Sequence, residues 1–285
     1  MWYIMEKTQT MLDLSERLIR SISSWHSYGV YEDSESIEEL INLGADVNHL
    51  HGTVLPLHCA CMVSDVESLL ILIRNGANIN LQDGYGRRAI HYAAEKNSEC
   101  TEVLVKHGSS INAGDANQDT ALHWAVFKNN EPCVKLLLEK GAIVDARDYN
   151  EDTPLSWAAR KGNIEVMRLL LDYNASVNLR NANGETPISR TLHLQNIGLN
   201  TTSDDACLEL LFLAGGKIEY KHQNIKHTNS NETLKCIVKY STNVRSLRDL
   251  SIYTVRSSLG YQYLPKIVEK LPIPYQIKKI VLLKK

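Results

Sequence analysis

Apolar and polar positions follow a repeating block through the middle of the chain. Each block opens with a short apolar run such as "TALHWAVF" at 120–127, and a leucine-rich run such as "CVKLLLEK" at 133–140 follows it. Both runs have the three-to-four-residue spacing of a helix with one buried face. The pattern therefore predicts pairs of short helices that are connected by polar loops.

The block recurs at a nearly constant spacing. The aligned residues His58, His91, His123, Ser156 and Ser189 are separated by 33, 32, 33 and 33 residues. A second marker recurs as "LGADVN" (43–48), "NGANIN" (75–80), "HGSSIN" (107–112), "KGAIVD" (140–145) and "YNASVN" (173–178). The opening motifs resemble the T-P-L-H-x-A signature of ankyrin repeats, whose period is 33 residues. The resemblance implies an all-α solenoid of stacked helix pairs.

Local signals agree with these helix pairs. Thr120 and Thr153 can cap a first helix, and Pro154 and Pro187 fit its first turn. Residues that favour a left-handed backbone end the second helix, namely Gly44, Gly76, Gly108, Gly141 and, in the last marker, Asn174. Alanine pairs at 93–94 and 158–159 would let the helices approach closely, while leucines at 136–138 and 169–171 would pack on the next repeat.

The two ends of the array depart from the pattern. We expect a capping helix around 14–25 and a degenerate first repeat that keeps only its second helix, at 36–48. The repeat that opens at Thr186 carries an insertion, which we expect to form a loop at 198–205. A last helix would begin near Asn231.

Bulk composition excludes several classes of protein. The net charge of −2 gives no general attraction to nucleic acid or to an anionic membrane. No apolar run has the length of a membrane span, and the N-terminus lacks a signal-peptide pattern. Six scattered cysteines are then expected to be reduced thiols of a cytoplasmic protein, with access to the nucleus left open.

The C-terminal tail has its own charge and its own helices. From residue 241 onward, nine Lys and Arg stand against two acidic residues, which gives +7 there and −9 in the rest. Leu247, Leu250, Ser251 and Val255 form one helical stripe that Leu259 continues. Two more helical pieces are expected at 266–270 and 275–283, separated by the prolines of "LPIP" at 271–274. Helices this short need a surface on which to pack.

Two motifs in this tail carry a more specific resemblance. Ser246-Leu247, with Ser251 and Val255 at the later positions, is similar to the Elongin-binding motif of SOCS boxes, except that Ser251 stands where Cys is usual. Residues 271–274 match the leucine-proline-apolar-proline Cullin box. The chain thus resembles the ankyrin repeat and SOCS box family, and segments such as "PLHCACMVSD" and "SLGYQYLP" resemble one member in particular. An unpaired hydroxyl at Ser251 would cost about 1–3 kcal/mol when buried, which would weaken Elongin binding.

The resemblance implies a function. It predicts an ankyrin-repeat solenoid followed by a three-helix SOCS box, with a capping segment at 1–35, repeats at 36–240 and the SOCS box at 241–285. The protein would be the substrate-recognition subunit of a ubiquitin ligase that contains Elongin B, Elongin C, and Cullin-5 with its RING-box subunit. Elongin would contact Leu247, Leu250, Ser251, Val255 and Leu259; Cullin-5 would contact Leu271, Pro272, Ile273 and Pro274.

A protein substrate would bind the repeats, at the hairpin tips and at the far ends of the first helices. Exposed aromatic residues beside Arg and Lys are typical anchors of protein interfaces. The candidates are Tyr85, Arg87, Asn117, Phe127, Lys128, Tyr149, Asn150 and Arg160. Trp124 and Trp157 are added with less weight, because with Tyr92 they form a stripe that a core role explains better than contact with a partner does.

No other chemistry stands out in the sequence. The chain has no phosphate-binding glycine loop and no His-Glu-x-x-His motif, so neither a cofactor nor a metal is expected. His58-Cys59-x-Cys61 contains metal-ligand residue types, but Cys59 and Cys61 would lie on different faces of a helix. Asn48 resembles the preferred site of the oxygen-sensing hydroxylase that modifies ankyrin repeats.

Two alternatives stay open. The chain could be a stand-alone ankyrin scaffold or inhibitor that sequesters its partner without degradation, and its tail would then only cap the repeats. An enzyme is the third class, which would require a cluster of perturbed titratable groups that the sequence does not indicate.

Overall fold

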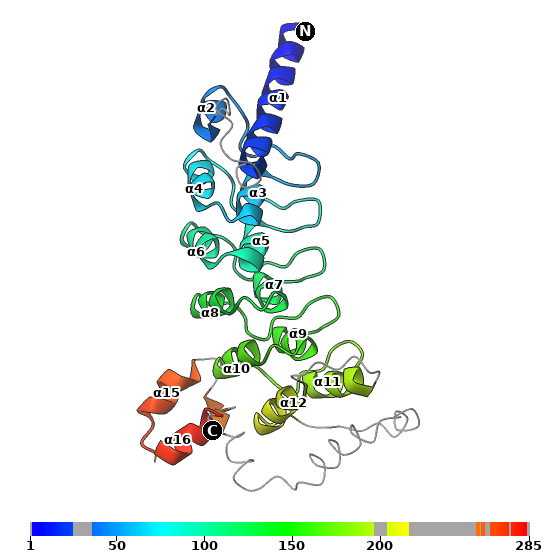
Figure 1. Cartoon of the computed structure of the whole chain (residues 1–285), viewed down its shortest axis with the longest axis vertical. Coiled ribbons are helices and arrows are strands. Elements are labelled where there is room, and N and C mark those ends of the chain that lie inside the picture. The colour runs from blue at the N-terminus through cyan, green and yellow to red at the C-terminus, as the bar shows by residue number, and fades with distance from the viewer. Residues whose placement is uncertain are drawn as a thin grey trace. The chain divides into compact units, whose positions relative to one another are not determined.

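A computed structural model describes residues 2–24, 36–196, 204–216, 255–256, 258–259, 263–273 and 275–283. The chain divides into two compact units, Met1–Ala142 and Ile143–Lys285. Every regular element in the described ranges is a helix, which confirms the all-α fold (Figure 1). None of these helices combines the length and apolar character that a membrane crossing requires.

The first unit contains four successive helix pairs. They are α1 (Trp2–Ser24) with α2 (Ile37–Asn42), α3 (Pro56–Val63) with α4 (Val66–Arg74), α5 (Ala89–Lys96) with α6 (Ser98–Lys106), and α7 (Ala121–Phe127) with α8 (Glu131–Glu139). In Figure 1 the first helices of these pairs form one row, the second helices form another, and long hairpins extend from the row of first helices. The expected capping helix is longer than predicted, because α1 begins at Trp2 and spans 23 residues.

The second unit holds the remaining described helices. α9 (Pro154–Lys161) pairs with α10 (Ile164–Asp172), and α11 (Pro187–Asn196) pairs with α12 (Asp204–Leu213). The predicted loop at 198–205 is wrong at its end, because residues 204 and 205 already belong to α12; residues 197–203 lie outside the described ranges. The tail contributes α15 (Leu264–Lys270) and α16 (Tyr275–Val281). The last repeat helix expected near Asn231 and the boundary expected at 240 also lie outside those ranges.

Thr153 caps α9 as predicted, because its side chain accepts the backbone N–H of Ser156 at 3.3 Å. Ser36, which the sequence analysis did not single out, caps α2 by accepting the backbone N–H of Glu39 at 3.1 Å. The five residues expected at the ends of second helices all have positive φ, from 62° at Asn174 to 108° at Gly44. Thr120 differs from the simple cap, because its backbone N–H donates to Nδ1 of His123 at 3.2 Å and its hydroxyl lies 3.0 Å from the same nitrogen.

The core lies between the helices of neighbouring repeats. The alanine pairs at 93–94 and 158–159 are buried, as are Leu137, Leu138, Leu170 and Leu171, whereas Leu136 and Leu169 are half-buried. Each fully buried leucine contributes about 1.5–3 kcal/mol to folding. Cys59, Cys61, Cys100, Cys133 and Cys207 are free and buried, and Cys236 lies outside the described ranges. Burial raises the pKa of Cys59 and of Cys100 to about 11, so these thiols stay protonated at neutral pH.

Candidate functional site

A buried aspartate organises three of the hairpins between repeats. Oδ1 of Asp115 accepts the backbone N–H groups of Asn117 at 2.8 Å and of Asp119 at 3.0 Å. Its Oδ2 accepts the indole N–H of Trp124 at 3.1 Å. The carboxylate therefore fixes the loop with one oxygen and the aromatic side chain of the following helix with the other.

The same arrangement recurs in both units. In the first unit, Asp83 accepts the backbone N–H groups of Tyr85 and Arg87, and the hydroxyl of Tyr92 donates to its Oδ2 at 2.5 Å. In the second unit, Asp148 accepts two hairpin N–H groups and the indole N–H of Trp157 at 3.0 Å. Burial and the bond to Asp83 raise the pKa of Tyr92. We call these three arrangements the Asp–aromatic staples.

The staples hold the hairpin tips so that their side chains face solvent. Tyr85 and Tyr149 are 60% and 80% exposed, and Asn117 and Asn150 are exposed as well. Successive tips are joined by backbone bonds, such as Ala116 N–H to Tyr85 O at 3.1 Å. Gly86 allows this approach, because it has φ +71° and a Cβ there would lie 2.8 Å from the nitrogen of Ala116. The four predicted tip residues thus lie on ordered, accessible hairpins.

Arg87 lies against the aromatic stripe of the first unit. Its guanidinium carbon lies 3.7 Å from the centroid of the Trp124 ring and 5.5 Å from that of Tyr92. Its Nε lies 3.5 Å from Oδ2 of Asp115, and 23% of the side chain is exposed. Cation–π contacts and an ion pair with a buried carboxylate hold the guanidinium in place before any partner arrives.

Phe127 and Lys128 continue this surface. The rings of Trp124 and Phe127 meet edge to face with centroids 5.9 Å apart. Lys128 Nζ lies 2.6 Å from Oε1 of Glu95 and 5.6 Å from the centroid of the Phe127 ring, and its side chain is 41% exposed. The structure therefore brings four predicted substrate residues together in the first unit. We call Arg87, Trp124, Phe127 and Lys128 the aromatic–cationic strip.

The second unit carries a smaller counterpart. The guanidinium carbon of Arg160 lies 5.2 Å from the centroid of the Trp157 ring. Trp157 is buried, so its ring supports Arg160 and offers a partner little area of its own. Arg190, which the sequence analysis did not single out, forms an ion pair with the buried Asp152. Asp152 also accepts the side-chain amide of Asn181 at 3.0 Å.

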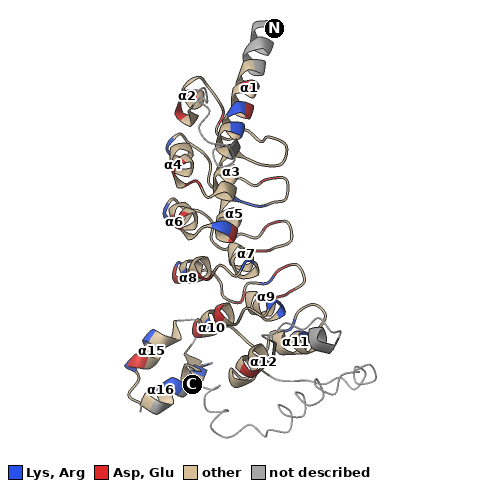
Figure 2. Ribbon diagram, viewed as in Figure 1, with Lys and Arg blue, Asp and Glu red and all other residues tan. Residues whose placement is uncertain are grey.

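The described part of the tail forms a small hydrophobic core. Leu264, Val268, Val281 and Leu282 are buried together, and Val255, Leu259 and Leu271 pack against them. Pro272 is exposed and Ile273 is half-buried at the bend between α15 and α16. Figure 2 shows Lys and Arg on both of these helices. Leu247, Leu250, Ser251 and Pro274 lie outside the described ranges. The Elongin and Cullin contacts predicted for the tail stay predictions at all of its residues.

Arg256 is a site residue that sequence reasoning missed. It is 4% exposed, and its guanidinium donates to the backbone oxygens of Leu171 at 2.5 Å and of Val281 at 2.6 Å. Its own backbone oxygen accepts the side-chain amide of Asn174 at 2.9 Å. Nearby, the rings of Tyr173 and Tyr263 have centroids 5.0 Å apart. These contacts join the tail to the C-terminal end of α10 within the second unit.

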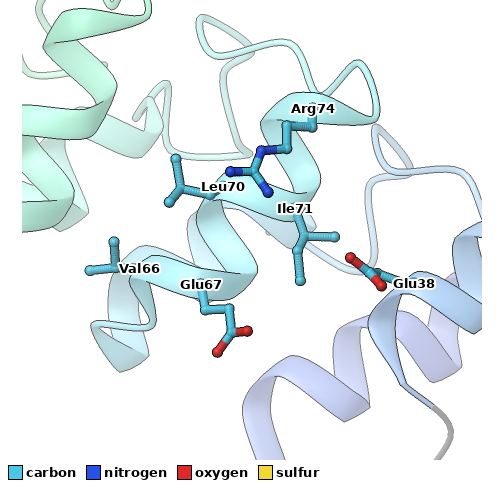
Figure 3. Close-up of a pocket in the computed structure, with 6 residues that line it drawn as sticks. All are labelled: Glu38, Val66, Glu67, Leu70, Ile71 and Arg74. Carbon is cyan, nitrogen blue, oxygen red and sulfur yellow. The ribbon is translucent and has the colours of Figure 1, made fainter.

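Asn48 and a pocket beside α2 are weaker candidates for a functional site. The side-chain amide of Asn48 donates to Gly76 O at 3.1 Å and accepts the backbone N–H of Asn78 at 2.8 Å, so a hydroxylase would first have to break both bonds. A pocket of about 410 Å³ between α2 and α4 is lined by Glu38, Val66, Glu67, Leu70, Ile71 and Arg74, and Figure 3 shows Glu38 projecting from α2 toward α4. It contains none of the predicted site residues. The described residues include no cluster of three potential metal ligands.

Comparison with known proteins shows similarity over nearly the whole chain. A family model described as ankyrin repeats in three copies matches residues 26–115, 57–148, 111–181 and 142–194. Ankyrin repeat and SOCS box protein 8 of Mus musculus is 61% identical over 286 residues, which cover 99% of this chain and 98% of the relative. The proteins of that name from Bos taurus and Homo sapiens match with the same identity and coverage. The similarity therefore includes the tail as well as the repeats.

Proposed function

Because the chain belongs to the ankyrin repeat and SOCS box family, we propose that it is the substrate-recognition subunit of an Elongin B/C–Cullin-5–RING ubiquitin ligase. The observation that supports this most is the 61% identity that continues through the tail, where both SOCS-box motifs lie. The protein would act in the cytoplasm as an adaptor, with catalysis in its partner subunits. Its substrate would be ubiquitinated and degraded by the proteasome.

The tail would recruit the ligase, from residue 241 onward. Leu247 would enter a pocket of Elongin C, with Leu250, Ser251, Val255 and Leu259 beside it. Pro272 is exposed at the bend after α15, which suits a contact with Cullin-5 by residues 271–274. Leu271, Val255 and Leu259 also pack on the tail's own core, so part of each side chain is already engaged.

The repeats at 36–240 would hold the substrate. The aromatic–cationic strip combines Trp and Arg, which are the residue types enriched where interface energy concentrates. Its side chains are fixed by the Asp–aromatic staples and by the Lys128–Glu95 ion pair, which lowers the ordering cost of binding. Tyr85 and Asn117 extend this surface in the first unit, and Tyr149, Asn150 and Arg160 form a second contact area in the other unit.

The decisive experiment is co-purification with Elongin B and Elongin C. Replacing Leu247 with Asp should abolish the interaction, because burying a Leu contributes about 1.5–3 kcal/mol and a carboxylate would be buried in its place. Leu43→Asp is the matched control, since Leu43 is 62% exposed on the repeats. Elongin binding that survives in the Leu247 variant would refute the proposed function.

A stand-alone scaffold is the second candidate, and one observation favours it. The described part of the tail has its own core and is bonded to α10 through Arg256. This candidate predicts that residues 241–285 resist limited proteolysis equally well with and without Elongin B/C. The ligase function predicts a marked gain in protection when Elongin B/C is added.

A further inference from the structure

A buried cation, Arg256, lies at the joint between the repeats and the tail. Arg256 reaches Leu171 O at the end of α10 with one terminal nitrogen and Val281 O at the end of α16 with the other. The last carbonyls of a helix lack partners within the helix, and they carry its partial negative charge. One guanidinium therefore caps two helix ends, one from the repeats and one from the tail.

The geometry suits arginine and no other residue. Two carbonyl groups from two helices are bonded by the two terminal nitrogens of one planar group, whereas lysine has a single donor nitrogen. Burial lowers the pKa of Arg256 to about 10 and the charge of Asp172 opposes this shift, so the side chain stays protonated at neutral pH. Asn174 adds a third bond from α10 to the backbone oxygen of Arg256.

Arg256 also follows directly on Val255, which belongs to the predicted Elongin-binding set. Val255 and Arg256 are both helical, and the two side chains have different surroundings. Val255 packs against the tail core, whereas Arg256 is bonded to α10 and α16. The segment that would bind Elongin is therefore the same one that is tied to the repeats.

We propose that Arg256 is a positioning residue, which holds the SOCS box in one orientation on the last repeats and so fixes where the ligase delivers ubiquitin. This inference rests on the proposed function. Arg256 would contact neither substrate nor Elongin in this role. Its loss should leave both binding steps intact and should widen the range of lysines that receive ubiquitin.

Two variants separate positioning from folding. Arg256→Gln removes the two hydrogen bonds from the guanidinium to the backbone oxygens of Leu171 and Val281. Asn174→Gly removes the amide bond to Arg256, and glycine tolerates the backbone conformation at this position, where φ is +62°. Lys266→Ala is the control, because Lys266 is exposed on α15 of the same tail.

The test uses the full chain in complex with Elongin B/C, with spin labels introduced as non-natural amino acids at the exposed positions 168 on α10 and 270 on α15. Pulsed electron resonance should give a narrow distance distribution for the parent and for Lys266→Ala. We expect at least a twofold broadening for Arg256→Gln and a smaller one for Asn174→Gly. The reconstituted ligase should then modify additional lysines of the chain itself, while Elongin affinity stays within about twofold.

The outcomes distinguish the two proposals. Unchanged distances and unchanged ubiquitination sites in both variants would overturn the positioning role. A loss of Elongin binding in both variants would also overturn it, since Arg256 would then maintain the fold of the tail. A parent chain that fails to bind Elongin B/C would refute the proposed function instead.

Discussion

Trp124 donates its indole N–H to Asp115 at 3.1 Å, nine residues back along the chain. The aspartate also holds its hairpin through two backbone N–H bonds and lies 3.5 Å from Nε of Arg87. One carboxylate thus connects a loop, a helix and a candidate binding residue. Loss of this carboxylate would therefore affect all three.

Replacing Asp115 should destabilise the repeats. Asp115→Ala removes three hydrogen bonds and leaves buried donors unpaired, so we expect the free energy of unfolding to fall by about 2–4 kcal/mol. Asp115→Asn should cost less, because Asn181 makes both backbone bonds in the equivalent place of a later hairpin, at 3.0 and 2.9 Å. Urea denaturation of the full chain measures both values. The exposed Glu139→Ala is the control, and an equal loss in that variant would contradict the role of the staple.

Replacing Arg87 should weaken substrate binding without affecting the ligase. Proximity labelling with a chain that cannot bind Cullin-5 should enrich substrates that are not consumed. Arg87→Ala should reduce that enrichment about tenfold or more, because hot-spot residues contribute 2 kcal/mol or more. Arg74→Ala, exposed on α4, should leave the same proteins enriched. Unchanged labelling by the Arg87 variant would show that the substrate binds outside the aromatic–cationic strip.

The Cullin contact should be separable from the Elongin contact. Pro272→Ala combined with Pro274→Ala should abolish co-purification of Cullin-5 while Elongin B/C is retained. Leu271 should be kept in this test, because it packs against the tail core and its loss would disturb the fold. Lys270→Ala is exposed and adjacent, and it serves as the control. Simultaneous loss of Elongin in the double variant would show that the two contacts are not independent.

Acid should destabilise the first unit through His58. Its Nδ1 is buried without a hydrogen-bond partner, and burial lowers its pKa from 6.5 to about 4. As the pH falls from 6.5 to 4, the unfolded chain takes up a proton that the folded chain excludes, so up to ~3 kcal/mol of stability is lost. Unfolding free energies at pH 7, 6 and 5 should decline for the parent.

The decline should be shallower in His58→Gln, which cannot titrate. His91 has a pKa lowered mainly by burial, so it contributes in the same direction and keeps some slope in the variant. Equal slopes for parent and variant would show that His58 is not excluded from protonation in the folded chain.

Local signals explain why the helices could be predicted from the sequence. Gly44 and Asn174 end helices through their own backbone preference, and Pro154 starts one through its own ring. The Asp–aromatic staples were visible as a spacing of nine residues, as between Asp83 and Tyr92, but the spacing has meaning only when the hairpin folds back. A repeated Asp in the hairpins was the signal that could have revealed them.

Arg256 gave no such signal. Its acceptors are backbone oxygens 85 and 25 residues away, and every residue carries such an oxygen. The length of α1 was also underestimated, because α1 begins at Trp2 and not near residue 14. Interactions with backbone oxygens, which every residue carries, can be found only in the three-dimensional structure.

The staples have a practical consequence for engineering. Since each buried aspartate shapes its hairpin through backbone N–H groups, its bonds to Tyr85, Asn117 and Asn150 do not depend on the identity of those three side chains. Those three positions can be randomised with the scaffold left intact. Under the proposed function, the chain is a starting point for libraries of redirected protein degraders.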